Sequence, residues 1–260
     1  MAQKKPQWVI DKERSKAGPE RVWLFGIHAV RDALMNPNRK KHRLILTLNA
    51  ANKLEDALAA SRMTPEIADA RKFNAPLDPQ SVHQGAAVEV SPLDWGSVSE
   101  LCRIDNDAPR VLLLDRVTDP HNIGAILRSA EVFGARAVIA PHRHSAPETG
   151  ALAKTASGAL ERQPYLRVKN LANAMNALKE MGYFILGLDG EAEETVADVL
   201  GQLPDVPLAL ALGAEGPGLR QLTRETCHKL GRLPAQGSFG SLNVSNAAAV
   251  ALYASLPRGA

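Results

Sequence analysis

The chain has 260 residues, of which 45% are hydrophobic and 23% charged, with a formal net charge of +3. That length suits one large domain or two smaller ones, and no apolar run approaches the roughly 20 residues that cross a bilayer. Cys102 and Cys227 are the only cysteines, which excludes a disulfide framework and a cysteine zinc site, so we expect a cytoplasmic protein without a metal.

The first segment, residues 1–19, is charged and shows no periodicity. It lacks the apolar centre of a secretory signal, and we expect a flexible tail.

Residues 20–91 alternate between helical and extended patterns, which predicts a small α/β domain. Within it we expect helices over Gly26–Leu34, Asn52–Ser61 and Pro65–Phe73, and strands over Leu44–Leu48 and Ala86–Val90.

A basic run follows the first of these helices and contains Arg39, Lys40, Lys41 and Arg43. Such clusters attract phosphate backbones, but a lone basic run is just as often a solvated loop. A smaller cluster, His142-Arg143-His144, lies further along the chain.

Residues 92–108 are rich in Pro, Asp and Asn and read as a linker with a short helix near Gly96–Arg103. Residues 109–260 then alternate apolar strands with helices, which predicts a parallel sheet covered on both faces. The expected strands are Val111–Leu114, Ala137–Ala140, Tyr183–Leu188 and Leu208–Leu212.

Three short segments in this second region concentrate polar side chains at the ends of apolar runs. In the first, Asp119-Pro120 is suited to begin a helix that carries Asn122, Gly124 and Arg128. The second is the glycine-rich turn Gly213–Gly218 with Glu215 inside it. The third is Ser241-Leu242-Asn243-Val244-Ser245, which leads into an apolar helix over Ala247–Leu256.

Each segment alone is common in α/β proteins, but together and in this order they resemble the signature of the SpoU/TrmH class of RNA ribose 2′-O-methyltransferases, within the SPOUT superfamily. The resemblance implies a C-terminal SPOUT domain with a deep trefoil knot, whose loops hold S-adenosylmethionine. It also implies a small N-terminal L30e-like domain that binds RNA, and a homodimer. No Gly-x-Gly-x-x-Gly fingerprint follows the first strand, so a Rossmann cofactor site is not expected.

The resemblance also assigns roles to residues. It makes Arg128 the catalytic arginine, which either loses its proton in a perturbed site or binds the substrate phosphate. It makes Glu215 the carboxylate that fixes Arg128, with Asn122 and Asn243 beside them. The simpler alternative for Arg128 is a surface pair with Glu131. The residues implied for S-adenosylmethionine binding are Leu212, Gly213, Glu215, Gly216, Leu233, Ser241, Leu242 and Asn243. The resemblance also favours RNA as the partner of the basic run, so the residues expected to bind RNA are Arg39, Lys40, Lys41, Arg43 and Arg128.

The two-domain layout is similar to that of the members of the class that methylate a guanosine of 23S ribosomal RNA. Transfer RNA is the alternative substrate. A non-catalytic RNA-binding factor is a second alternative, which the presence of both Arg128 and Glu215 disfavours. A nucleotide hydrolase is disfavoured because the chain has neither a phosphate-binding Gly-x-x-x-x-Gly-Lys loop nor a Gly-x-Ser-x-Gly elbow.

Overall fold

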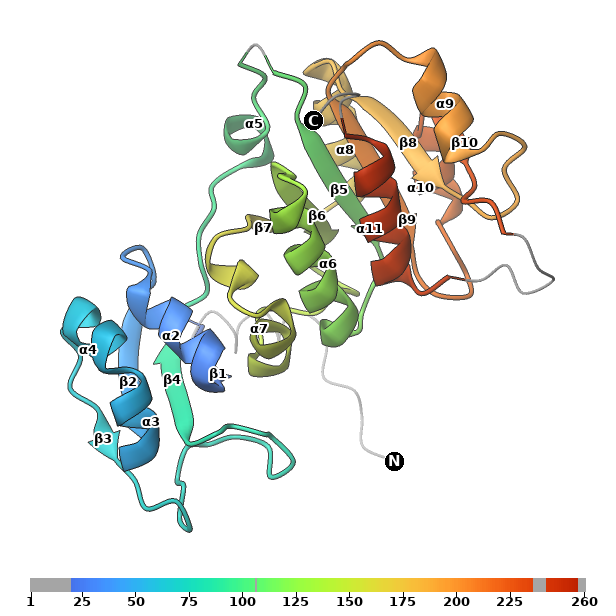
Figure 1. Cartoon of the computed structure of the whole chain (residues 1–260). Coiled ribbons are helices and arrows are strands. Elements are labelled where there is room, and N and C mark those ends of the chain that lie inside the picture. The colour runs from blue at the N-terminus through green and yellow to red at the C-terminus, as the bar shows by residue number, and fades with distance from the viewer. Residues whose placement is uncertain (1–19, 106, 236–241, 257–260) are drawn as a thin grey trace, which may run out of the picture.

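A computed structural model describes residues 20–105, 107–235 and 242–256 (Figure 1). The tail expected over residues 1–19 lies outside this part of the chain, as does Ser241. Two sheets organise the described residues, and Figure 1 shows the smaller one at the lower left and the larger one at the upper right.

The smaller sheet has the strand order β1-β4-β2-β3, with β1 and β2 antiparallel to the central β4. Its strands are β1 (Val22–Phe25), β2 (Lys41–Leu46), β3 (Glu66–Ile67) and β4 (Ala86–Val90). The helices of this part are α2 (Ile27–Met35), α3 (Leu48–Lys53) and α4 (Glu55–Ser61). Leu24, Val30, Leu44 and Val88 are among the fully buried side chains between them.

Two helix predictions in this region need correction. The helix expected over Asn52–Ser61 is part of two helices, α3 and α4, which meet at Leu54. The helix expected over Pro65–Phe73 is wrong, because Glu66–Ile67 forms a strand that pairs in parallel with the end of β2. The backbone N–H of Ala68 donates to Leu46 O at 2.8 Å, so a partner 22 positions earlier in the chain decides this conformation.

The larger sheet confirms the predicted parallel α/β architecture. Its strand order is β10-β8-β9-β5-β6-β7, and all five pairings are parallel. Its strands are β5 (Arg110–Asp115), β6 (Ala137–Pro141), β7 (Tyr165–Val168), β8 (Phe184–Leu188), β9 (Leu208–Gly213) and β10 (Lys229–Gly231). Because all strands run the same way, their carboxyl ends lie along one edge of the sheet.

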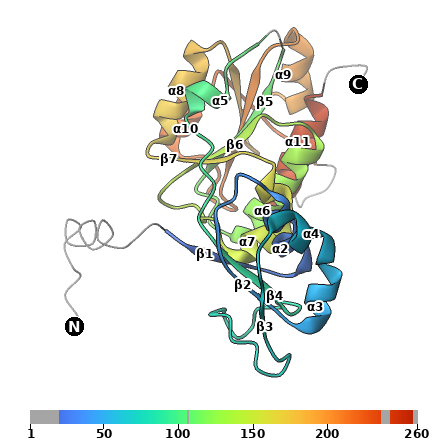
Figure 2. The same cartoon turned by 90° about the vertical axis from the view of Figure 1, so that its left-hand side faces the viewer.

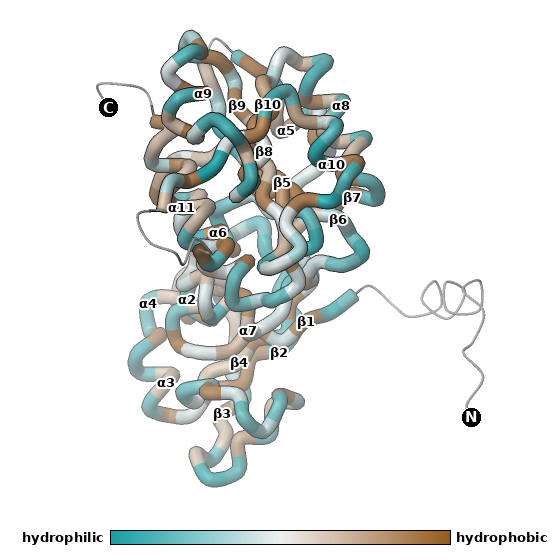
Figure 3. Tube along the Cα trace, turned by 90° about the vertical axis from the view of Figure 1, so that its right-hand side faces the viewer, coloured by the Kyte–Doolittle hydropathy of each residue, from teal (hydrophilic) through white to brown (hydrophobic). Residues whose placement is uncertain are grey.

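Helices cover both faces of the larger sheet, as Figure 2 shows. One face carries α6 (Pro120–Val132), α7 (Gly150–Ala156), the short 3-10 helix η1 (Ala159–Glu161), α9 (Val196–Gln202) and α11 (Val244–Ala254). The other carries α5 (Val98–Leu101), α8 (Leu171–Glu180) and α10 (Gln221–Thr226). Each face of the sheet has its own hydrophobic core, and successive β5 residues alternate between them. Leu112 and Leu114 lie in the core on the α6 side, and Val111 and Leu113 lie in the core on the α8 side. The hydropathy in Figure 3 follows this arrangement, with apolar strands inside and polar segments outside.

The two sheets meet at a buried ion cluster centred on Arg39, which has a fully buried side chain. Its guanidinium donates to Glu148 Oε2 at 2.7 Å and to Glu161 Oε1 at 2.7 Å. The second carboxylate oxygen of Glu161 accepts from Asn36 Nδ2 at 2.9 Å. Burial raises the pKa of the Glu148 carboxyl, and the Arg39 charge opposes that rise. One arginine beside the smaller sheet therefore binds two carboxylates of the larger domain.

Burial also determines the chemistry of the two cysteines, because it raises the pKa of both thiols to about 11. Few thiolates form at neutral pH when the thiol pKa is so high, and the thiolate is the reactive form. We therefore expect Cys102 and Cys227 to react slowly with a disulfide reagent at pH 7.5 in the folded protein and rapidly in urea. Fast labelling of either thiol without urea would contradict this prediction.

Candidate functional site

The loop that follows β9 lies at the carboxyl edge of the larger sheet and carries Glu215. The loop closes on itself through a backbone bridge between Ala214 and Gly218. A side chain at Gly213 would meet the backbone carbon of Gly218 at 2.0 Å, so only glycine fits at the end of β9. Gly216 and Gly218 have φ of 83° and 67°, which glycine adopts without strain. These glycines explain why a carboxylate is presented here on a tight turn.

The first turn of α6 brings Asn122 to the same place. Asp119 accepts the backbone N–H of His121 at 2.9 Å and Pro120 occupies the first turn, so the helix begins as the sequence predicts. Further along, a side chain at Gly124 would meet Leu152 O at 2.7 Å, so this glycine permits the close approach of α6 to α7.

Asn243 reaches this point from α11, where it is the N-cap residue and accepts the Ser245 N–H at 2.9 Å. Its Nδ2 donates to Glu215 Oε1 at 2.5 Å and to Asn122 Oδ1 at 3.0 Å. Asn122 Nδ2 donates to the same Glu215 oxygen at 3.1 Å. The three sequence segments thus converge on one carboxylate, although they lie up to 121 positions apart.

A cavity of about 450 Å³ adjoins this cluster. Its walls include six of the residues predicted to bind a cofactor, namely Leu212, Gly213, Glu215, Gly216, Leu233 and Leu242. Leucine side chains form an apolar wall, and the glycine-rich loop adds backbone polar groups and a carboxylate. This combination fits a ligand with one flat apolar part and one polar or cationic part.

Sequence reasoning missed the segment Leu188-Asp189-Gly190, which lines the same cavity after β8. The Asp189 carboxylate pairs with Arg224 of α10. The sequence feature that could have identified this segment is an apolar strand followed by an acidic residue and a glycine. Glu215 and Gly216 form the same kind of pair after β9.

Arg128 does not join this cluster. It is exposed on α6 and makes no hydrogen bond or ion pair with another described residue. Six residues after Asn122, it lies about 9 Å further along the helix and about 120° around it. The expected pair between Glu215 and Arg128 is therefore absent within the described chain. The alternative pair with Glu131 is wrong as well, because Glu131 binds Arg162, with Arg162 Nη2 donating to Oε2 at 3.3 Å.

The basic run after α2 does not present to solvent all four of the cations that we expected to bind RNA. Arg39 is buried in the ion cluster between the sheets. Lys41 donates to the backbone oxygens of Asn36 and Leu34 at 2.8 and 3.3 Å. Arg43 pairs with Glu66 at 2.7 Å, and Lys40 is exposed. Only Lys40, and in part Arg43, remain available to phosphate.

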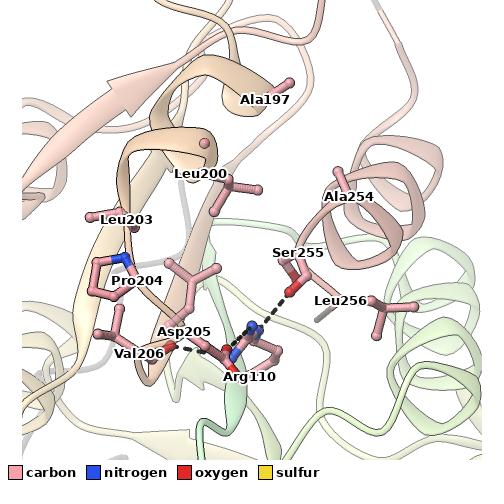
Figure 4. Close-up of a pocket in the computed structure, with 12 residues that line it drawn as sticks. Arg110, Ala197, Leu200, Leu203, Pro204, Asp205, Val206, Ala254, Ser255 and Leu256 are labelled. Atoms are coloured by element: carbon pink, nitrogen blue, oxygen red, sulfur yellow. Dashed lines mark hydrogen bonds and ion pairs between the residues drawn. The ribbon is translucent and has the colours of Figure 1, made fainter. Parts of the chain in front are cut away.

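Another cavity, of about 460 Å³, lies at the opposite edge of the sheet and contains Arg110 (Figure 4). The Arg110 guanidinium donates to Ser255 O at 2.9 Å, to Val206 O at 3.2 Å and to Asp205 Oδ1 at 3.0 Å. These bonds anchor the end of α11 to the start of the strands. Because the donors of Arg110 are used in this way, we assign the residue a structural role.

None of the helices among the described residues is long and apolar enough to span a membrane. In the same part of the chain, no three His, Cys, Asp or Glu side chains gather as a metal site would require.

Comparison with known proteins matches both halves of the chain to family models. Residues 109–253 match the SpoU rRNA Methylase family, and residues 23–95 match the RNA 2′-O ribose methyltransferase substrate-binding family. A 23S rRNA (guanosine-2′-O-)-methyltransferase RlmB from Pseudomonas putida is 41% identical over 238 residues, covering 88% of this chain and 94% of the relative. The RlmB of Vibrio cholerae is 38% identical, with coverage of 88% and 94%.

Solved structures share the fold. The SpoU methyltransferase AviRb from Streptomyces viridochromogenes superposes with a TM-score of 0.76 at 23% identity, covering 94% of this chain and 91% of its own. An AdoMet-bound rRNA methyltransferase from Sinorhizobium meliloti gives a TM-score of 0.76 at 19% identity, with coverage of 94% and 89%.

Proposed function

This chain belongs to the SpoU rRNA methylase family, and from that premise we propose that it transfers a methyl group from S-adenosylmethionine to the ribose 2′-hydroxyl of a guanosine in 23S ribosomal RNA. Relatives at 38–41% identity over about nine tenths of the chain carry that activity in their names. The observation that carries the proposal is the convergence of Asn122, Glu215 and Asn243 beside a cavity suited to the methyl donor.

The cavity fits S-adenosylmethionine by its chemistry. Leu212, Leu233 and Leu242 provide apolar contact for an adenine ring, and the loop from Gly213 to Gly218 offers backbone polar groups. Glu215 adds negative charge, which favours a sulfonium cation. When bound, this cofactor supplies a methyl group on a sulfur that leaves without needing a proton.

The protein must therefore hold the ribose hydroxyl in line with the methyl group and help its proton leave. We propose that the two asparagine amides, fixed by Glu215, position the ribose. We propose that the Arg128 guanidinium binds the adjacent phosphate and stabilises the negative charge that develops on the hydroxyl oxygen. A protonated guanidinium performs both tasks without acting as a base, and the hydroxyl proton passes to solvent water.

We further propose that the enzyme is a homodimer built on α6 and α11. Val132, Val250 and Tyr253 are large apolar side chains, 71%, 47% and 68% exposed, on these two adjacent helices. Arg128 is one turn before Val132 and shares its side of α6. A two-fold contact over this face would place Arg128 of each copy toward the other copy's site, which accounts for its distance from Glu215 within one chain.

We also propose that the chain after β10 threads the trefoil knot expected of the family. In support, the segment returns to the β9 loop, where the Val244 N–H lies 3.5 Å from Glu215 Oε1. A cytoplasmic location follows from the ribosomal RNA substrate and is part of the same proposal.

Replacing Val250 with glutamate should convert the dimer into monomers, because the change places a charge in an apolar contact. Light scattering during size-exclusion chromatography measures the mass directly. Leu222→Glu on α10 is a matched control, since Leu222 is 59% exposed on the other face of the sheet. A Val250→Glu protein that stays dimeric, or a monomeric wild type, would refute the α6–α11 interface.

Methyl transfer from labelled S-adenosylmethionine tests the substrate. We expect label on unmodified 23S ribosomal RNA and none on transfer RNA. Label on transfer RNA alone would support methyl transfer but show that the substrate is transfer RNA rather than 23S ribosomal RNA. Failure to label either RNA, with the cofactor bound, would favour a non-catalytic RNA-binding factor.

A further inference from the structure

A second groove at the carboxyl edge of the larger sheet plays no part in the site described above. It has a volume of about 640 Å³ and lies between the connector after β4, the loop after β6, and the junction of β7 with α8. We call it the connector groove and define it by Trp95, His142, Arg167, Lys169, Asn170 and Asn173.

The groove contains donors that lack acceptors. Among the described residues, three buried side-chain polar atoms have no hydrogen-bond partner, and two of them are Trp95 Nε1 and Arg167 Nε. A buried donor without an acceptor destabilises the folded protein, so such atoms call for an explanation. Both residues line the connector groove, which points to a ligand rich in acceptor atoms.

Positive charge faces the same space. Lys169 is exposed and has no ion-pair partner among the described residues. Arg167 uses Nη2 to bind His142 O at 2.6 Å, which fixes its guanidinium beside the groove. Three carboxylates also line the groove: Glu20, Asp94 and Glu148. Arg39, which also pairs with Glu161, binds Glu148 at 2.7 Å, and Asp94 accepts the Gly96 N–H at 3.0 Å.

The groove also lies along a line of cations that begins near Glu215. In the strand order β9-β5-β6-β7, β7 is two strands from β5, or about 10 Å. An exposed arginine follows each intervening strand, Arg116 after β5 and Arg143 after β6. Lys169 follows β7 and continues this line to the connector groove.

We propose that the connector groove binds one unpaired nucleotide of the substrate RNA, near the methylated ribose, with its base against Trp95 and its phosphate at Lys169. This proposal rests on the proposed function and adds to it the path of the RNA. An aromatic ring beside cations is the usual arrangement for holding a single-stranded base without reading its sequence. Phosphate and base oxygens would supply the acceptors that the buried donors lack.

The test compares Lys169→Gln with Lys179→Gln, which makes the same change near the other end of α8. Binding of a labelled single-stranded oligoribonucleotide is measured by fluorescence anisotropy over a salt series. The Lys169→Gln variant should lower the slope of log K against log salt by about 0.7, as expected for one lost phosphate contact on a single strand. It should also raise KM for 23S ribosomal RNA while leaving kcat and S-adenosylmethionine affinity unchanged.

Trp95→Leu should weaken oligoribonucleotide binding by about tenfold, within the range of one lost stacking contact. Equal binding and salt slopes for Lys169→Gln, Lys179→Gln and wild type would overturn the proposal. The binding readout does not depend on catalysis. If RNA affinity depends on Lys169 but no methyl transfer occurs, RNA binding in the groove is supported and the proposed function is refuted. If methyl transfer occurs but RNA affinity does not depend on Lys169, the proposed function is supported and RNA binding in the groove is refuted.

Discussion

Replacing Arg128 with alanine is expected to lower the rate of methyl transfer at least about 100-fold, with the free energy of unfolding changed by no more than about 0.5 kcal/mol. The activity loss follows from removing the cation assigned to the developing oxyanion. The small stability change follows from exposure, because Arg128 has no partner among the described residues. Single-turnover transfer to 23S ribosomal RNA and urea unfolding measure the two quantities.

Arg128→Lys is the informative companion variant. Lysine keeps the charge but loses the planar fork that binds phosphate through two bonds, so we expect an intermediate rate. Cofactor affinity should not change in either variant, since Arg128 does not line the cavity. Full activity in Arg128→Ala would show that Arg128 has no role in methyl transfer. Weaker cofactor binding would show that Arg128 contacts the cofactor instead.

The largest expected effect on stability belongs to Arg39→Ala, which should destabilise the protein by about 3–5 kcal/mol. The variant leaves Glu148 and Glu161 buried without a positive partner, although both accepted bonds from the guanidinium. Urea unfolding followed by circular dichroism measures the loss. Since the cluster joins the two domains, protease cleavage of the connector should also become faster.

Two further variants separate charge burial from lost packing. Arg43→Ala removes an arginine from the same basic run, but its pair with Glu66 is at the surface and should matter little. Adding Glu148→Gln and Glu161→Gln to Arg39→Ala removes the stranded charges and should recover part of the stability. An Arg39→Ala protein as stable as Arg43→Ala would refute the role of the cluster.

The sequence was most informative where a short pattern carries its own chemistry. Glu215 lies in a glycine turn directly after strand β9, and Asn122 and Asn243 lie where the helices α6 and α11 begin. The family resemblance, rather than this pattern, named six of the residues that line the adjoining cavity. Neither identified Asp189, because a single Asp-Gly after a strand is too common to stand out.

Other errors came from interactions between distant parts of the chain. The strands β1, β7 and β10 are three or four residues long and were not predicted, since their pairing partners alone define them. Arg39 was expected to be a surface cation. Its partner Glu161 lies 122 positions away, so the local sequence does not show that Arg39 is paired and buried. Arg128 was placed beside Glu215 by family resemblance, whereas helix geometry separates it from Asn122 within one chain.

Methylation of a ribose hydroxyl in ribosomal RNA leaves a distinctive product nucleoside, which can be identified directly. Unmodified 23S ribosomal RNA would be incubated with the enzyme and S-adenosylmethionine, digested to nucleosides and analysed by mass spectrometry. We expect 2′-O-methylguanosine from the wild-type enzyme and none from the Arg128→Ala variant. A methyl group on a base, or on the ribose of another nucleoside, would contradict the proposed function.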